Sequence, residues 1–327
     1  MTRTPLRVSF AGGGTDLAAF YEKEDGAVFS TAITQYVWVT VKRHSEIFNE
    51  PIRVNYSRSE QVNEVGEIEN DIARECLRLL DIEPPVYIST VGDVPASTGL
   101  GGSGAFAVGL LNALHAFRDE RVSAGQLAEE ACHIEIDVLG EPIGKQDQYA
   151  AAFGGLNVFS FGPEGVVSVE HQRLAEGARR ELFDGLMLFW TGHQRDASGV
   201  LAEQQEKVPE RFGALQALRD QAHELKRLVA AGAIDRAGLG AVLDQGWRLK
   251  RTLAGGITNP QIDHWYGTAM AAGAVGGKLC GAGGGGFFLF VVPDDRKPAV
   301  RAALGLKELA IDHEPHGSQV VASVNGP

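Results

Sequence analysis

Short runs of apolar and β-branched residues predict β-strands along the chain. Leu6–Ala11 alternates weakly between apolar and polar positions, and Val28–Val41 is rich in valine, threonine, isoleucine and aromatic residues. The other expected strands are Arg53–Tyr56, Val86–Val91, Leu156–Phe161, Val166–Val169, Leu186–Thr191, Phe287–Val292 and Gln319–Val324. Strands are therefore expected in both halves of the chain.

Longer segments with apolar residues at helical spacing predict helices between these strands. Glu69–Leu80 shows this spacing, and Ala105–Phe117 is almost entirely apolar, which predicts a buried helix. Pro298–Leu304 begins with proline, a residue favoured in the first turn of a helix. The segment 197–272 has a mainly helical pattern. Its expected breaks lie at Pro209, around Gly232 and at Gly255–Pro260.

A further helix is expected to begin after Ser123. The Ser123 hydroxyl is expected to cap its first turn, and Gln126 completes the pattern of a capping box. The expected buried stripe consists of Leu127, Ala131, Ile134 and Val138. Glu135 lies beside this stripe rather than opposite it, so a carboxylate is expected next to the apolar face.

The stretch 95–105 is the most informative part of the chain. It reads Pro-Ala-Ser-Thr-Gly-Leu-Gly-Gly-Ser-Gly-Ala, and the apolar helix follows directly. Glycines let backbone N–H groups converge on one point, and the helix adds free N–H groups and the positive end of its dipole. This combination predicts a phosphate site in which the Ser103 hydroxyl reaches a bound cation. The residues expected to bind the cofactor are Pro95, Ser97, Gly99, Leu100, Gly101, Gly102, Ser103 and Gly104.

The same letters also fit the dinucleotide-binding pattern G-x-G-x-x-G, at Gly99, Gly101 and Gly104. That pattern needs a second strand with an acidic residue about 20 positions further on. Here Arg118–Gly125 is polar and leads into another helix, so Asp119 has the spacing but no strand. No Gly-Lys-Ser/Thr follows the glycines, which argues against a Walker A loop. The alternative that the chain is a nicotinamide-dependent oxidoreductase rests on this one match alone.

Composition narrows the class of protein. The chain has 327 residues, which favours about two domains, and 44% of them are hydrophobic. A formal net charge of −12 disfavours nucleic acid and acidic membrane surfaces as partners. The first ten residues lack an apolar signal segment, and the three cysteines, Cys76, Cys132 and Cys280, are widely spaced. A cytoplasmic location and a small-molecule partner are expected, and a homodimer is left open.

Three glycine-rich elements lie far apart in the sequence, at Gly12–Asp16, Gly99–Gly104 and Lys278–Gly286. Ordered glycines cost conformational entropy, so three such clusters suggest backbone in close approach to one ligand site. With the strand residues from Pro5, they resemble the three motifs of the GHMP kinases, in order and spacing. This family includes galactokinases, homoserine kinases and mevalonate kinases.

The resemblance implies an α+β protein with the GHMP kinase fold. Residues 1–175 would form an N-terminal domain like ribosomal protein S5 domain 2, with the ATP and metal site. Residues 176–327 would form a ferredoxin-like C-terminal domain that completes the sugar site. ATP and Mg²⁺ are implied, and ATP and acceptor would meet in the cleft between the domains. One departure is Gly102, which stands where the family commonly has a serine.

The resemblance also assigns roles to charged residues. The segment 135–147 matches the part of the family that carries the metal glutamate and the catalytic aspartate. Ser103 and Glu135 are therefore expected to bind Mg²⁺ through hard oxygen atoms. Asp147 is expected to take the proton of the acceptor hydroxyl. Arg7 is expected to steady Asp147 or to meet the transferring phosphoryl group.

Within the family, the segments Arg3–Asp16, Gly140–Tyr149 and Thr191–Ser198 resemble the kinases that act on heptose 7-phosphates. Galactokinase-type members have an acidic residue and a histidine where this chain has Gly13 and Gly14. The resemblance implies ATP-dependent phosphorylation of the anomeric hydroxyl of D-glycero-D-manno-heptose 7-phosphate, giving the 1,7-bisphosphate. Alternatives are another sugar or sugar-phosphate kinase of the family, fucokinase- or galactokinase-like, and a non-catalytic sugar sensor.

A sugar phosphate brings a dianion to a protein of negative net charge, so local cations and backbone donors must capture it. Lys145 lies two residues before the expected base, and Arg195 follows a turn after a buried strand. One or both are expected to grip the phosphate. The full set expected to contact the substrate is Gly13, Gly14, Thr15, Asp16, Lys145, Arg195, Gly283 and Gly284.

Overall fold

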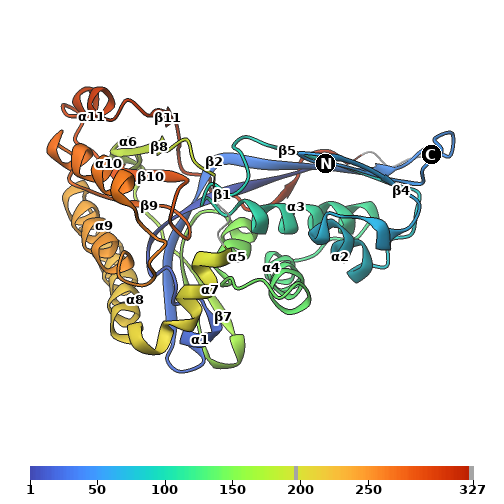
Figure 1. Cartoon of the computed structure of the whole chain (residues 1–327), viewed down its shortest axis with the longest axis horizontal. Helices are drawn as coiled ribbons and strands as arrows, with labels where there is room; N and C mark the ends of the chain where they lie inside the picture. The colour runs from blue at the N-terminus through green and yellow to red at the C-terminus, as the bar shows by residue number, and fades with distance from the viewer. Residues whose placement is uncertain (195–197, 324–327) are drawn as a thin grey trace.

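The computed structural model describes residues 1–194 and 198–323, which form two sheets with helices packed against them (Figure 1). The first sheet has eight strands. Six of them follow the order β12-β1-β2-β5-β3-β4, β6 also pairs with β2, and β7 pairs with β6. Its strands are β1 (Thr2–Ala11), β2 (Gly26–Arg43), β3 (Ile52–Asn55), β4 (Ser59–Val62), β5 (Val86–Gly92), β6 (Leu156–Phe161), β7 (Val167–His171) and β12 (Gln319–Val320).

The long strand β2 organises the first sheet. One edge of β2 pairs with β1, and the other edge pairs first with β6 and then with β5. The register with β1 shifts after Pro5, a residue that has no N–H to donate to the ladder. Regular pairing resumes at Leu6, so Arg7 and Ser9 lie on one face of the strand.

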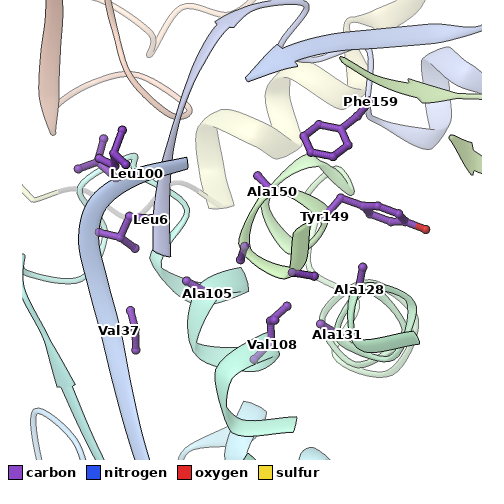
Figure 2. Close-up of a cluster of buried hydrophobic side chains, with 14 of the residues drawn as sticks. Leu6, Val37, Leu100, Ala105, Val108, Ala128, Ala131, Tyr149, Ala150 and Phe159 are labelled. Carbon is purple, nitrogen blue, oxygen red and sulfur yellow. The ribbon is translucent and has the colours of Figure 1, made fainter. Parts of the chain in front are cut away.

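Helices α2 (Asp71–Leu79), α3 (Gly102–Phe117), α4 (Ala124–Cys132) and α5 (Gln146–Phe153) gather on one side of this sheet (Figure 1). Figure 2 shows Ala105 and Val108 of α3 between Leu6 on the strand side and Ala131 on the helix side. All four are buried. Small side chains on the helices allow this close packing, which fixes the start of α3 against β1.

The second sheet has the order β11-β8-β10-β9, with every pair antiparallel. The strands of this sheet and the helices between them are, in chain order, β8 (Leu186–Trp190), α7 (Ser198–Glu206), α8 (Val208–Ala230), α9 (Arg236–Lys250), α10 (Pro260–Ala271), β9 (Gly276–Leu279), β10 (Phe287–Val291), α11 (Lys297–Leu304) and β11 (Lys307–Leu309). The succession strand, helices, two strands, helix, strand is that of a ferredoxin-like unit. The expected α+β fold class is confirmed.

The end of the described chain returns to the first sheet. The Ser318 N–H donates to the carbonyl oxygen of Ala151 in α5, and the Gly155 N–H donates to the carbonyl oxygen of Glu314. Strand β12 then pairs with β1. Strands β1 to β7 lie in the first sheet, and strands β8 to β11 lie in the second. However, the segment 312–320 belongs with the first sheet.

Several expected elements need correction. Strands β4, β9 and β11 and helix α6 (Glu176–Asp184) were not expected from the pattern, because the strands are short and polar or glycine-rich. The last strand is shorter than expected and covers only Gln319–Val320. The Ser123 cap is present, but the Gln126 side chain donates to Glu130 instead of completing a capping box.

The stripe expected after Ser123 is wrong at its last position. Val138 is 48% exposed, because the chain changes from the α-helix α4 to a π-helical turn over His133–Val138. This wider turn rotates the following side chains relative to the α-helical stripe. It also brings Glu135 into the interior, where the side chain is buried. Among the described residues, no helix is both long and apolar enough to cross a bilayer.

Candidate active site

Residues of all three glycine-rich elements line one cavity, and the second and third elements contact each other there. A Cβ atom at Gly99 would lie 2.6 Å from the carbonyl oxygen of Cys280, and Gly99 has φ +81°. A Cβ at Gly281 would collide with the backbone of Gly99 in return. The loop after β9 (Gly276–Leu279) therefore packs backbone to backbone against the loop before α3, a contact that only glycine permits.

A cavity of about 340 Å³ opens beside these loops. Its walls come from β1 and the loop after it, the loop before α3, the π-helical turn, the start of α5, and helices α7, α8 and α9. The sequence-predicted residues that line it are Arg7, Gly13, Gly14, Asp16, Ser97, Gly99, Gly101, Gly102, Ser103, Glu135 and Asp147. These residues span 141 positions of the sequence, yet they surround one space.

Arg7 and Asp147 form the central pair of the cavity. The Arg7 Nε atom donates to Asp147 Oδ1 at 2.8 Å, and Nη2 lies 2.6 Å from the same oxygen. The remaining guanidinium nitrogen, Nη1, donates to the carbonyl oxygen of Gly99 at 2.8 Å, and the Arg7 N–H donates to that of Leu100 at 3.0 Å. The Arg7 side chain is only 6% exposed, whereas that of Asp147 is 26% exposed. One arginine thus fixes both the carboxylate and the glycine loop, and the carboxylate still faces the cavity.

The start of α3 has the geometry of an anion site. Gly101 is the residue before the helix and has φ +79°, in the left-handed region. No side chain caps the first turn, so its backbone N–H groups are free for a ligand. Gly104 packs closely against the backbone of Asp147, because a Cβ there would lie 3.1 Å from the Asp147 carbonyl carbon. The helix start and the start of α5 are thereby held together.

Glu135 is a buried carboxylate at the back of the cavity. The Gln148 amide donates to its Oε2 atom at 2.6 Å, and the Ser103 hydroxyl is a second hydrogen-bond partner. Burial raises the pKa of Glu135 to about 7, and these two hydrogen bonds only partly offset that effect. Both partners are neutral, and among the described residues the carboxylate forms no ion pair with a cation.

Asp16 is a second carboxylate close to Asp147. Its Oδ1 atom accepts a hydrogen bond from the Gly14 N–H at 3.0 Å, and its Oδ2 atom accepts from the Gln146 amide at 3.0 Å. Burial raises the pKa of Asp16, and the nearby carboxylate of Asp147 raises it further. A Cβ at Gly144 would collide with the Asp16 carboxylate, so the glycine makes room for it.

Other predicted residues lie away from the cavity. The Lys145 Nζ atom donates to the carbonyl oxygen of Gly165 at 2.8 Å and lies 3.9 Å from Glu129. Thr15 is buried and bonds to the carbonyl oxygens of Gly12 and Ala27. The residues that do not line the cavity are Pro95, Leu100, Gly104, Thr15, Lys145, Gly283 and Gly284. Arg195 lies outside the described residues.

The sequence missed several residues that line the cavity. They are Ser9 on β1, Gln146 at the start of α5, Gln204 on α7, Lys250 at the end of α9 and Lys278 on β9. Lys278 is the first residue of the third glycine-rich element, a position that signals proximity to the site. Lys250 has no such signal, because its helix carries no motif and reaches the cavity only through the tertiary fold.

Comparisons with known proteins agree with this geometry. Residues 66–155 match the GHMP kinases N terminal domain, and residues 222–310 match the GHMP kinases C terminal domain. A D-glycero-alpha-D-manno-heptose 7-phosphate kinase of Campylobacter jejuni is 30% identical over 307 residues, which is 90% of each chain. The chain belongs to the GHMP kinase family. The expected ATP-dependent kinase is thereby confirmed, and the oxidoreductase alternative is excluded.

Two further relatives of this GHMP kinase show how widely its fold is shared. The crystal structure of a D-glycero-D-manno-heptose 1-phosphate kinase from Bacteroides thetaiotaomicron has a TM-score of 0.78 and 25% identity, and the match covers 98% of this chain and 99% of that one. A galactokinase of Pyrococcus furiosus is 25% identical over 341 residues, 94% of this chain and 93% of the relative. The relatives therefore share the family but differ in the acceptors that their names give.

Proposed function

We propose that this kinase transfers the γ-phosphoryl group of ATP to the anomeric hydroxyl of D-glycero-D-manno-heptose 7-phosphate and releases the 1,7-bisphosphate. The Arg7–Asp147 pair is the observation that supports this chemistry. Arg7 contacts both Asp147 and the glycine loop, and both side chains line the cavity. The acceptor class is supported by the heptose phosphate kinases among the relatives.

Phosphoryl transfer requires the donor and the acceptor in line and compensation of developing charge. The glycine loop and the free N–H groups of α3 would hold the nucleotide phosphates. Asp147 would accept the proton of the acceptor hydroxyl as that oxygen attacks phosphorus. Arg7 holds Asp147 and the Gly99 carbonyl at once, so base and loop keep one geometry during the reaction. Asp16, fixed by Gly14 and Gln146, would orient sugar hydroxyls.

The residues present also fit Mg²⁺. Glu135 and Ser103 offer two hard oxygen atoms, and Glu135 is buried without a cationic partner among residues 1–194 and 198–323. Within residues 1–194 and 198–323, no cluster of three or more acidic, histidine or cysteine side chains is arranged to hold a metal. That donor set suits Mg²⁺, which commonly takes one or two protein ligands together with substrate phosphates. When bound, Mg²⁺ neutralises charge on the β- and γ-phosphates.

Glu135→Gln is expected to raise the Mg²⁺ concentration needed for half-maximal turnover, with little change in binding of metal-free nucleotide. Ser103→Ala should act in the same direction but less, because a neutral hydroxyl is the weaker ligand. Turnover against Mg²⁺ concentration measures the effect. The control is Glu176→Gln, which changes an exposed carboxylate paired with Arg180 far from the cavity. Unchanged Mg²⁺ dependence in both site variants would place the metal elsewhere.

The acceptor is tested by ATP consumption with a panel of sugars. The wild type should prefer heptose 7-phosphate to free heptose by roughly 10-fold or more, since a charged hydrogen bond contributes about 1.5–3 kcal/mol. Phosphorus NMR of the product should show a new phosphate on the anomeric carbon. The panel should include heptose 1-phosphate and galactose, which represent the other relatives. Equal rates on free and phosphorylated heptose would contradict the proposal and favour a plain sugar kinase.

A further inference from the structure

Two lysines give one wall of the cavity an unpaired positive charge. The Lys250 Nζ atom donates to the carbonyl oxygens of Leu279, at 3.1 Å, and Gly281. The Lys278 Nζ atom donates to the carbonyl oxygen of Ser9 at 2.8 Å. An ammonium group has three donors, so each lysine keeps at least one beyond these bonds. Neither lysine forms an ion pair with a carboxylate in the part of the chain that the structure describes.

The surroundings make these charges costly in the empty cavity. Burial, together with the positive charges of Lys278 and Arg7, lowers the pKa of Lys250 to about 7. Burial likewise lowers the pKa of Lys278 to about 8. Asp147, a carboxylate of the same cavity, is already paired with Arg7. An anion in the cavity would therefore be attracted to this wall.

A buried hydroxyl without a partner lies in the same cavity. The Ser9 side-chain oxygen is inaccessible to solvent and has no hydrogen-bond partner in the structure, and the residue is 9% exposed. Ser9 lines the cavity and shares a strand face with Arg7. Its backbone carbonyl is the acceptor of Lys278, so hydroxyl and cation are neighbours. Buried polar groups are nearly always satisfied, so the orphan hydroxyl points to a ligand.

We propose that Lys250 and the Ser9 hydroxyl form an oxyanion subsite that binds the phosphate already carried by the acceptor. The subsite rests on the proposed function, since it deepens the choice of a sugar phosphate over a free sugar. The nucleotide phosphates have their own donors in the loop before α3. Lys250 comes instead from α9, on the side of the cavity that α7 and α8 close. Lys250 would thus supply the cation that the sequence led us to expect from Lys145, which does not line the cavity.

The first test compares Lys250→Met with the wild type on heptose 7-phosphate and on free heptose. KM for the phosphorylated sugar should rise roughly 10–150-fold, the range for a lost charged hydrogen bond. KM for ATP and KM for free heptose should stay near the wild-type values. Arg248→Met is the control, because Arg248 lies on the same helix, is 73% exposed and pairs with Asp244.

A second variant keeps the test valid if Lys250→Met folds poorly after the Leu279 and Gly281 carbonyl groups lose their donor. Ser9→Ala removes a hydroxyl with no protein partner, so no hydrogen bond within the chain is lost. It should raise KM for heptose 7-phosphate about 2–10-fold, as expected for a neutral hydrogen bond. The effect on free heptose should again be absent, which separates a contact to phosphate from a general loss of structure.

The outcomes separate this subsite from the proposed function. Equal losses on both sugars, or a fall in kcat with unchanged KM, would overturn the subsite and assign Lys250 to the phosphoryl group in transfer. If the wild type uses no sugar phosphate, the proposed function fails. Calorimetry with inorganic phosphate then tests the subsite alone, using protein saturated with a non-hydrolysable ATP analogue. Weaker phosphate binding in Lys250→Met and Ser9→Ala supports the subsite, and wild-type binding in both refutes it.

Discussion

Asp147→Asn is expected to lower turnover by roughly 10²-fold or more, because a positioned general base contributes roughly 10²–10⁴-fold. Asparagine has nearly the same shape, and its side-chain oxygen can still accept a hydrogen bond from Arg7. The loop that Arg7 holds through Gly99 should therefore keep its position. ATP affinity measured by calorimetry should stay near the wild-type value, whereas single-turnover phosphoryl transfer should slow.

The matched control for this base is Asp137→Asn. Asp137 lies ten residues earlier, and its side chain is 66% exposed. It pairs with His133 and does not line the cavity. Its turnover should equal that of the wild type. Near-normal turnover in purified Asp147→Asn would remove Asp147 from the role of base. In that case positioning and charge compensation alone would carry the reaction, as they do in much of phosphoryl transfer.

Gly101→Val is expected to abolish ATP binding. Gly101 has φ +79°, a conformation that a β-branched residue adopts only with strain. A Cβ there would also lie 3.2 Å from Arg7 Cγ and 3.4 Å from Asp147 Cγ, so valine would press on the central pair as well as block the phosphates. Calorimetric titration with ATP measures the loss. Circular dichroism must show a folded protein for that loss to count.

Two other glycines make this result interpretable. Gly177→Val places valine on the exposed start of α6, where a Cβ meets nothing within 4 Å, and should leave ATP affinity unchanged. At Gly102, too, a Cβ meets nothing within 4 Å in the structure. Any loss of ATP affinity in Gly102→Ala therefore reports contact with the ligand itself. Wild-type affinity in Gly101→Val would show that the loop is an ordinary turn.

Local patterns were sufficient for the elements that carry the nucleotide side. The glycine loop and the apolar residues after it predicted α3, and the alternating run after Pro5 predicted the strand that holds Arg7. The roles of Arg7 and Asp147 came from the family resemblance, because the residues are 140 positions apart. The structure adds the reason why the two must act together, because the Arg7 guanidinium group donates a hydrogen bond to the Asp147 carboxylate.

Sequence reasoning was weakest where neighbours in space decide the outcome. Strand β9 contains two glycines and exists because it pairs with β10. Lys145 stands beside the expected base in sequence, yet it precedes the first turn of α5 and reaches Gly165 instead. Lys250 is the opposite case, since nothing around it in the sequence points to a site. Only packing of α9 against the second sheet brings it to the cavity.

The return of residues 312–320 to the first sheet has a consequence for how the protein is made. The Thr34 N–H donates to the carbonyl oxygen of Asp312, and Ser318 bonds to both α5 and the Thr4 side chain. These partners lie 167 to 314 residues apart in the sequence, and contacts so distant in sequence form late and slowly. The helix that carries Asp147 thus gains its contact with Ser318 only after residue 318 has been translated. We expect ribosome-bound chains that stop before residue 312 to remain open to proteases at α5, even though the second sheet and the first sheet up to β7 have already been translated.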